Sequence, residues 1–277
     1  MPSVLVTGAN RGIGLAITRH MSAKGWDVYA TARSDDALRE LASLPGVHPT
    51  RLDITDRKSL SALPAQLPDE LDAVVNNAGI IVNGPVEGLT LDDLSRQLDV
   101  NVTAQIGVTQ AVLPMIRAAR GRIVFISSVS GLIATPGTGA YNASKFALEA
   151  LADALRMELR PWGIRVSLVE PGPIRTDMWG EALVEHDRMV AGLAEEHRTL
   201  YASHLAGTRK LLGRMQKLAA DPKKVVSAVE HALTARRPKS RYLLDIASRV
   251  QKVAVGLTPT PINDAILAAA TTTKSLS

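Results

Sequence analysis

The chain has 277 residues, of which 46% are hydrophobic and only 3% aromatic, so a core of aliphatic side chains is expected, as in helices packed on a parallel sheet. The formal net charge is +5, but the basic residues are scattered and form no nucleic-acid-binding pattern, so no nucleic-acid partner is expected. The chain has no cysteine, which excludes disulfides and thiolate chemistry, and no run of about 18 apolar residues; we therefore expect a soluble, cytoplasmic protein without a transmembrane segment.

Short apolar runs alternate along the chain with longer segments of helical periodicity. The expected strands are 3–7, 27–32, 47–53, 71–76, 121–128, 164–171 and 240–246, and the expected helices are 13–24, 35–44, 56–66, 90–119, 141–161 and 222–236. Several strands lack apolar/polar alternation, which indicates a sheet covered on both faces. This order predicts an α/β fold: a doubly wound, mostly parallel seven-stranded sheet with helices on both faces, in a single domain spanning 1–277.

Two segments depart from the regular alternation. Residues 173–220 form a long insertion after the sixth strand, and apolar positions at helical spacing predict one or two amphipathic helices in it: Leu183, Met189, Leu193, Leu200 and Leu205. Residues 247–277 form a C-terminal extension expected to end as a short helix and a frayed terminus.

A glycine-rich turn follows the first expected strand. "VLVTGANRGIGLAI" places Gly8, Gly12 and Gly14 between that strand and a helix. Backbone N–H groups and the positive end of the helix can hold a pyrophosphate there. In a chain that continues βαβ, this turn predicts dinucleotide binding; glycines used only for turning and packing are the alternative.

The end of the second strand indicates which dinucleotide is bound. An acidic residue there would bind the ribose 2′-hydroxyl of NAD, whereas an arginine accommodates the 2′-phosphate of NADP. The strand ends "YATARS", which offers Arg33, and Arg11 in the glycine turn could provide a second guanidinium. NADP(H) is therefore preferred and NAD(H) remains possible; Asp35 and Asp36 could be helix N-caps.

"AYNASK" places the phenol of Tyr141 and the ammonium of Lys145 one helical turn apart. Lowering a phenol pKa from about 10 to about 7 requires roughly 4 kcal/mol, at ~1.36 kcal/mol per unit. An exposed pair one turn apart supplies only ~0.2–0.5 kcal/mol. A charge near 4 Å at an effective dielectric of about 20 supplies ~4 kcal/mol. The pair can therefore be catalytic only where it is shielded from water, and we expect the bound cofactor and substrate to shield it.

Several motifs in order carry a resemblance to a known family. They are Thr7-Gly8-x-x-x-Gly12-x-Gly14, "NNAG" at 76–79, Asn101, "ISS" at 126–128, Tyr141-x-x-x-Lys145 and "PGPIRT" at 171–176. With these motifs the chain resembles the short-chain dehydrogenase/reductase family, over about residues 3 to 176. The resemblance implies a Rossmann-type fold and an NAD(P)-dependent oxidoreductase.

The resemblance also implies roles for individual residues. In the catalytic set, Tyr141 would be the general acid or base, and Ser128 would bind the same substrate oxygen, with Ser127 as the alternative assignment. Lys145 would hold the nicotinamide ribose and lower the pKa of Tyr141, and Asn101 would organise a water linked to Lys145. Besides Tyr141 and Lys145, the expected cofactor-binding residues are Gly8, Asn10, Arg11, Gly12, Ile13, Gly14, Arg33, Asp53, Ile54, Asn77, Ala78, Gly79, Pro171, Gly172, Ile174 and Thr176. Asp53 would cap the adenine amino group with Ile54 beside the ring, and Ile174 and Thr176 would bind the carboxamide.

The substrate side is less specific. The insertion at 173–220 is expected to cover a small lipophilic carbonyl or alcohol substrate, although its apolar stripe, with Met178 and Trp179, could serve only to pack the insertion onto the domain. The region after the insertion resembles, loosely, relatives that act on steroids and retinoids. The basic segment around 209–224 could contact a membrane surface, and the dispersed histidines predict no metal site.

We therefore expect an NADP(H)-dependent oxidoreductase that transfers a hydride between nicotinamide and a carbonyl or secondary-alcohol carbon. By family likeness it would be a homodimer or homotetramer formed through the helices at 90–119 and 141–161. The alternative is a non-enzymatic dinucleotide sensor or scaffold on the same fold.

Overall fold

A single parallel sheet forms the centre of the protein. The structure is a computed structural model that describes residues 1–175, 178–244 and 257–271. The strands are β1 (Ser3–Val6), β2 (Asp27–Ala32), β3 (Val47–Arg51), β4 (Ala73–Asn76), β5 (Arg122–Ile126), β6 (Arg165–Glu170) and β7 (Arg241–Leu243). Their order is β3-β2-β1-β4-β5-β6-β7, and every pairing among the described strands is parallel. The expected seven-stranded α/β sheet is confirmed.

Helices connect the strands and extend beyond them. They are α1 (Gly12–Ala23), α2 (Asp35–Ala42), α3 (Arg57–Ala62), α4 (Leu91–Leu98), α5 (Ala104–Ala118), α6 (Gly139–Glu158), α7 (Met178–Gly192), α8 (Glu195–Leu200), α9 (Ala202–Leu218), α10 (Lys223–Thr234) and α12 (Thr260–Thr271). In the described part of the chain, no helix is long and apolar enough to cross a membrane.

Two sequence-based expectations about helices need correction. The segment 90–119 is not one regular helix, because a π-helical turn over Asp99–Thr103 joins α4 to α5. The insertion contains three helices, α7, α8 and α9, instead of one or two. Leu200 does not join their apolar face: it ends the six-residue α8 and is 64% exposed.

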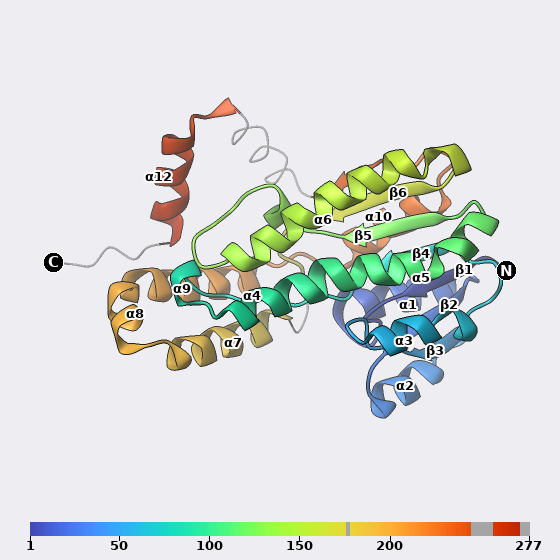
Figure 1. Cartoon of the computed structure of the whole chain (residues 1–277), viewed down its shortest axis with the longest axis horizontal. Coiled ribbons are helices and arrows are strands. Elements are labelled where there is room, and N and C mark those ends of the chain that lie inside the picture. The colour runs from blue at the N-terminus through green and yellow to red at the C-terminus, as the bar shows by residue number, and fades with distance from the viewer. Residues whose placement is uncertain (176–177, 245–256, 272–277) are drawn as a thin grey trace.

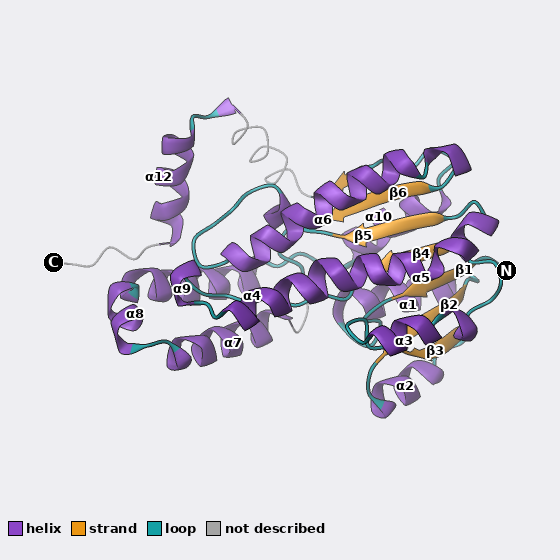
Figure 2. Cartoon of the chain, viewed as in Figure 1, coloured by secondary structure: helices purple, strands orange, loops and turns teal. Residues whose placement is uncertain are grey.

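The sheet is buried on both faces, as the strand composition predicted. Along β1, Val4 and Val6 pack into one apolar cluster with side chains of α1 and α10, while Leu5 points the other way into a second cluster with α5 and α6. Successive strand side chains point to opposite faces, so a strand covered on both sides must be apolar throughout. Figure 2 shows α5 and α6 lying across one face of the strands.

The insertion lies beyond the carboxyl ends of the strands. In Figures 1 and 2 the arrowheads of β5 and β6 point towards the side where α7, α8 and α9 are found. Ligands of doubly wound sheets bind beyond the carboxyl ends of the strands. The insertion is therefore placed to cover a ligand bound at that edge.

Candidate active site

The turn between β1 and α1 has the shape that a pyrophosphate needs. Gly8 and Gly12 adopt positive φ angles of 62° and 55°, a conformation that side chains disfavour. A Cβ on Gly14 would lie only 2.2 Å from the carbonyl oxygen of Gly8, so the start of α1 packs directly on the turn. In the described structure no side chain caps the amino end of α1, an arrangement that leaves its first backbone N–H groups for a dinucleotide phosphate.

The turn lies where the strand order reverses, between β1 and β4. Thr7 accepts hydrogen bonds through Oγ1 from the backbone N–H groups of Asn77 (2.9 Å) and Ala78 (3.1 Å). The Asn77 amide in turn donates to the carbonyls of Thr7 (2.9 Å) and Gly8 (3.2 Å). The "NNAG" segment thus fixes the glycine turn to the end of β4, so Asn77 has a structural role beside its predicted role in cofactor binding.

The end of β2 presents a guanidinium that forms no ion pair with the described carboxylates. Among the described residues, the Arg33 side chain is exposed and has no ion pair, whereas Asp35 pairs with Arg51 and Asp36 with Arg39. Neither aspartate is the N-cap considered from sequence. Ser34 caps α2 by accepting a hydrogen bond from the Ala37 N–H (3.3 Å).

Asp53 and Ile54 follow β3, at the same end of the sheet as Arg33 after β2. One Asp53 oxygen accepts hydrogen bonds from the N–H (3.0 Å) and the hydroxyl (2.7 Å) of Thr55. These two bonds, with a smaller contribution from Arg33, lower the pKa of Asp53, so it is an acceptor at neutral pH. Ile54 is buried.

Ser128 and Tyr141 come together at the carboxyl end of β5. Ser128 caps a short turn by accepting a hydrogen bond from the Ser130 N–H (3.1 Å), and its hydroxyl interacts with the phenol of Tyr141. Ser127, the alternative from sequence, is buried with no partner for its Oγ among the described residues. The geometry therefore favours Ser128 as the serine beside the tyrosine.

Lys145 lies one turn after Tyr141 on α6 and is 5% exposed. Its Nζ donates a hydrogen bond to the Ile126 carbonyl (2.9 Å) and lies 5.8 Å from the centroid of the Tyr141 ring. The shielding from water that this pair requires is thus already supplied to the ammonium by the protein.

The pKa of Tyr141 differs from the sequence-based expectation. Desolvation raises the pKa above its ordinary value, and the hydrogen bond with Ser128 lowers it by less. The predicted lowering by Lys145 is not found, because burial opposes the charged form of both groups. Desolvation also lowers the pKa of Lys145 to about 8. At neutral pH the tyrosine is therefore a protonated phenol beside a lysine that can exchange its proton.

Asn101 is fully buried in the π-helical turn between α4 and α5. Its side chain donates to the Ile80 carbonyl (2.9 Å) and accepts from the Ile80 N–H (2.9 Å). It also donates to the Ser144 hydroxyl (3.1 Å), which donates to the Tyr141 carbonyl (2.7 Å). The side chain therefore binds protein groups next to Tyr141 and Lys145, while its predicted role towards a water stays a prediction.

Gln97 is a functional candidate that the sequence analysis missed. It lies one turn before Asn101, is fully buried, and accepts a hydrogen bond from the Val82 N–H (2.6 Å) while donating to the Ile80 carbonyl (3.1 Å). Together Gln97 and Asn101 hold the loop after β4 against α6. The available signal was two amide side chains four residues apart within a helical segment.

The "PGPIRT" segment follows β6 and is fixed to the end of the insertion. Pro171 accepts hydrogen bonds from the Val129 N–H (3.2 Å) and the Ser128 hydroxyl (3.5 Å). Ile174 is buried and pairs with Ala220 in an isolated bridge after α9. Thr176, predicted to bind the carboxamide, lies outside the described residues.

A pocket of about 190 Å³ lies between the insertion and the rest of the protein. Its walls come from the loop after β4, the loop before α6, and helices α7 and α9, including Gly84, Pro136, Met189 and Leu205. Gly139, another lining residue, begins α6 two residues before Tyr141. The pocket therefore reaches the first turn of α6, the helix that carries the predicted catalytic tyrosine.

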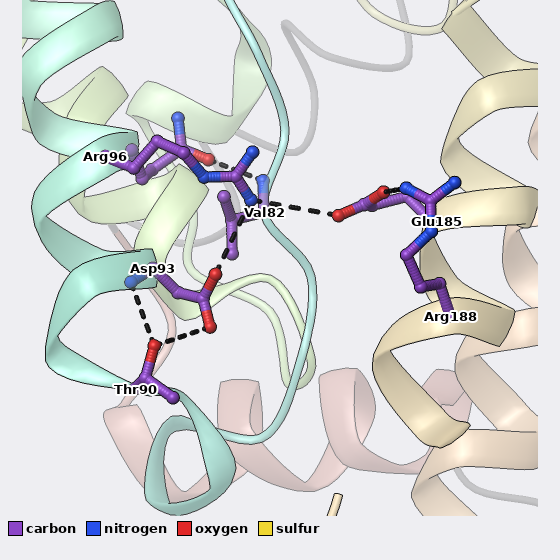
Figure 3. Close-up of polar contacts among 7 residues, drawn as sticks. Val82, Thr90, Asp93, Arg96, Glu185 and Arg188 are labelled. Atoms are coloured by element: carbon purple, nitrogen blue, oxygen red, sulfur yellow. Dashed lines mark hydrogen bonds and ion pairs between the residues drawn. The ribbon is translucent and has the colours of Figure 1, made fainter. Parts of the chain in front are cut away.

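Figure 3 shows how α7 is attached across this region. Arg96 on α4 lies 3.8 Å from Glu185 on α7, and Glu185 also pairs with Arg188 one turn further (2.5 Å). These contacts are partly exposed, so each contributes at most about 1 kcal/mol. They orient the helix without binding it tightly to α4. No cluster of metal-binding side chains occurs in the described segments.

The chain is similar to known proteins over nearly its full length. The model of the short chain dehydrogenase family matches residues 2–186. Retinol dehydrogenase 5 of Mus musculus is 36% identical over 278 residues, covering 95% of this chain and 87% of that protein. The NADPH-dependent 3-dehydrocapnine reductase of Ornithobacterium rhinotracheale is 32% identical, covering 96% of each. A crystal structure of a short-chain dehydrogenase from Streptomyces avermitilis is 30% identical, with a TM-score of 0.77, covering 97% of this chain and 95% of that one.

Proposed function

The chain belongs to the short-chain dehydrogenase/reductase family and is an NAD(P)-dependent oxidoreductase that acts on CH–OH groups; from this premise we propose that it uses NADP(H) with a lipophilic carbonyl or secondary alcohol. The observation that carries the proposal is the contact between Ser128 and the protonated phenol of Tyr141 at the carboxyl edge of the sheet. This pair offers two hydroxyls to one substrate oxygen. The alternative of a non-enzymatic sensor has no support in this arrangement.

In the proposed mechanism, the nicotinamide dinucleotide supplies or accepts the hydride when it is bound. The Ser128 hydroxyl donates a hydrogen bond to the substrate oxygen and keeps it beside the Tyr141 hydroxyl. Tyr141 donates its proton to that oxygen during reduction and removes it during oxidation. A positioned general acid of this kind contributes typically 10²–10⁴-fold to the rate.

Lys145 would return the proton to Tyr141. Its pKa of about 8 is close to neutral pH, where a proton carrier works in both directions. The hydrogen bond to the Ile126 carbonyl (2.9 Å) holds the amine in place. The remaining N–H groups of the Lys145 ammonium would hold the nicotinamide ribose. Asn101 would act as a positioning residue, through Ser144 and Ile80.

The preference for NADP(H) rests on Arg33. Its guanidinium lies at the end of β2, and the carboxylates that follow are paired with Arg51 and Arg39. A 2′-phosphate would bind this guanidinium by charge-assisted hydrogen bonds, while no aspartate remains to select a 2′-hydroxyl. The NADPH-dependent 3-dehydrocapnine reductase, 32% identical, supports this preference.

The substrate class rests on the pocket under α7 and α9. Met189 and Leu205 supply apolar walls next to the start of α6, as a lipophilic substrate requires. The similarity to a protein named retinol dehydrogenase 5, at 36% identity, is in accord with an apolar alcohol or aldehyde. The insertion would then serve as the cover of this pocket.

The proposed mechanism is tested by Tyr141→Phe, with Ser127→Ala as the control. A panel of lipophilic ketones is assayed by following NADPH absorbance with the parent and both variants. We expect kcat to fall about 10²–10⁴-fold in Tyr141→Phe and to stay near the parent value in Ser127→Ala, because the Ser127 hydroxyl has no partner in the described structure. Equal turnover by Tyr141→Phe and the parent would contradict the mechanism.

We also propose a homodimer or homotetramer that pairs through α5 and α6. Large apolar side chains are exposed along α6 and just after it: Phe146 (43%), Leu151 (41%), Met157 (62%) and Trp162 (48%). Phe146 and Met157, about three helical turns apart, lie on the same face of α6, and apolar side chains that gather on one exposed face mark interaction surfaces. Light scattering at micromolar concentration tests this, and a monomer would contradict it.

A further inference from the structure

The pocket at the start of α6 contains a histidine that the mechanism above does not use. His186 lies in α7, is 1% exposed, and lines the pocket. Its Nδ1 atom is buried and has no hydrogen-bond partner among the described residues. Buried polar atoms in native proteins are nearly always hydrogen-bonded, and one that is not needs an explanation. A bound ligand in the pocket is such an explanation.

The two residues that flank His186 hold it in this direction. Glu185 is paired with Arg96 of α4 at 3.8 Å (Figure 3), and Asp187 is paired with Arg209 of α9 at 2.8 Å. These ion pairs attach α7 to different helices on either side of the histidine. The rotation of α7 about its axis is therefore restrained, which keeps His186 among the residues that line the pocket.

Two other polar side chains of the pocket, Tyr201 and Thr135, already have partners. The Tyr201 hydroxyl donates to Glu87 (2.6 Å), and the hydroxyls of Thr135 and Thr138 bond to each other (2.7 Å). His186 Nδ1 is thus a polar atom in this pocket that is left for a ligand.

The charge state of His186 limits what it can bind. Desolvation lowers the pKa of the imidazole; smaller effects are that Asp187 and a hydrogen bond of the ring with the Leu205 backbone raise it and that Arg209 lowers it. The ring is therefore neutral at neutral pH. A neutral imidazole nitrogen suits an uncharged hydroxyl, which can both donate and accept a hydrogen bond, better than a carboxylate.

The size of the pocket limits the body of the ligand. Its volume of about 190 Å³ exceeds the 150 Å³ of an engineered apolar cavity that binds benzene. A single ring fits this volume, whose lining includes Met189, Leu205 and Gly139 at the start of α6.

We propose that His186 is a substrate-binding residue that accepts or donates a hydrogen bond to a second, uncharged hydroxyl of the substrate, placed across an apolar ring from the reacting carbon. This inference rests on the proposed function, since it takes the pocket to be the substrate pocket. It narrows the substrate class from lipophilic carbonyls in general to ring-containing ones with a distal hydroxyl.

The test uses two ketones that differ by one hydroxyl: 4-phenyl-2-butanone and 4-(4-hydroxyphenyl)-2-butanone. For the parent with NADPH, we expect kcat/KM to be about 2- to 12-fold higher for the hydroxylated ketone, the value of one neutral hydrogen bond. His186→Leu should bring this ratio to about one, and His186→Gln should restore part of it. Met189→Leu, which changes an apolar wall of the same pocket, should leave the ratio unchanged. Melting temperatures establish that each variant is folded.

A binding measurement separates this proposal from the catalytic one. In the protein labelled with ¹⁵N-histidine and saturated with NADP⁺, the hydroxylated ketone should shift the ring-nitrogen resonance that is missing from His186→Gln, and the other ketone should not. Three results would each overturn the role of His186. The first is a resonance that does not shift at saturation, and the second is a ratio of kcat/KM values for the two ketones that stays the same in His186→Leu. The third is that the hydroxylated ketone does not bind. Full activity of Tyr141→Phe on both ketones would instead overturn the proposed mechanism and leave the nitrogen shift as the measure of His186.

Discussion

Replacing Gly14 by alanine brings two opposing effects into one substitution. Gly14 is the third residue of α1, and alanine is favoured over glycine within a helix by about 1 kcal/mol. An added Cβ, however, would lie 2.2 Å from the Gly8 carbonyl oxygen and 2.6 Å from the Asn77 side-chain nitrogen. Non-bonded heavy atoms pack at about 3.5 Å or more, so the turn and the helix would have to separate by roughly 1 Å.

The size of the clash decides the sign of the effect. Overpacking costs about 1–3 kcal/mol, and the upper end applies here because the nearest atom belongs to the backbone and cannot rotate away. After the gain in helix propensity, we expect the free energy of unfolding to fall by about 2 kcal/mol. For a chain of 277 residues, at ~2.1 cal/mol/K of unfolding entropy per residue, this corresponds to a decrease of about 3–4 °C in melting temperature. Displacement of the turn should also weaken NADPH binding by at least about tenfold.

Gly213 provides the matched control. It lies within α9, and a Cβ built on it has no atom within 4 Å, so Gly213→Ala should show helix propensity alone. We expect it to raise the melting temperature by about 1–3 °C. Thermal unfolding and NADPH titration of both variants complete the test. A Gly14→Ala protein that melts as high as Gly213→Ala and binds NADPH normally would refute the reasoning.

Three further predictions concern charge and positioning. Arg33→Asp should lower the preference for NADPH over NADH by about 10- to 100-fold, which is the value of charge-assisted hydrogen bonds. The preference is measured as the ratio of the two KM values. Arg39→Asp is the control: Arg39 lies in the neighbouring helix α2 and is paired with Asp36, so this variant should leave the ratio unchanged. Lys145→Met should abolish turnover and yet raise the melting temperature at pH 7. The pKa of Lys145 is about 8 in the folded protein and about 10.4 in the unfolded chain. At ~1.36 kcal/mol per pKa unit, burying the charged lysine therefore lowers the stability of the parent by up to about 3 kcal/mol. That cost is complete below pH 8 and is relieved as pH rises to about 10.4, so the difference between parent and variant should shrink over this range, and a constant difference would contradict it. Gln97→Leu should lower kcat about tenfold or more with the protein folded, since it releases the N–H of Val82; unchanged kcat would show that this loop needs no such anchor.

The sheet could be predicted from sequence because strands and helices leave periodic signals. Apolar runs without alternation located β1, β4 and β5, whose apolar side chains are buried on both faces. The π-helical turn at Asp99–Thr103 could not be predicted, since one additional residue shifts the phase of the apolar pattern by a single position, and apolar residues on a helix face are already spaced by either three or four positions. The six residues of α8 are likewise too few to show a period, so the insertion was assigned too few helices.

The charge states in the site were harder to predict than the identities of its residues. The spacing of Tyr141 and Lys145 indicated that they interact, and Coulomb attraction suggested a lower pKa for the phenol. The structure adds burial, which acts on both groups and raises the pKa of Tyr141 while lowering that of Lys145. Desolvation depends on every atom packed around a group, and a spacing of four residues carries no information about it.

Many hydrogen bonds that organise this site join a side chain to the backbone. Thr7 binds the N–H groups of Asn77 and Ala78, Asn101 binds both backbone groups of Ile80, and Lys145 binds the carbonyl of Ile126. A backbone group is the same whichever residue carries it, so the sequence at the backbone partner contains no sign of these contacts. Only the side-chain partner is specified by its chemistry. It follows that an apolar exchange at Ile80 should be tolerated far better than any exchange of Asn101, although the two residues form the same pair of hydrogen bonds.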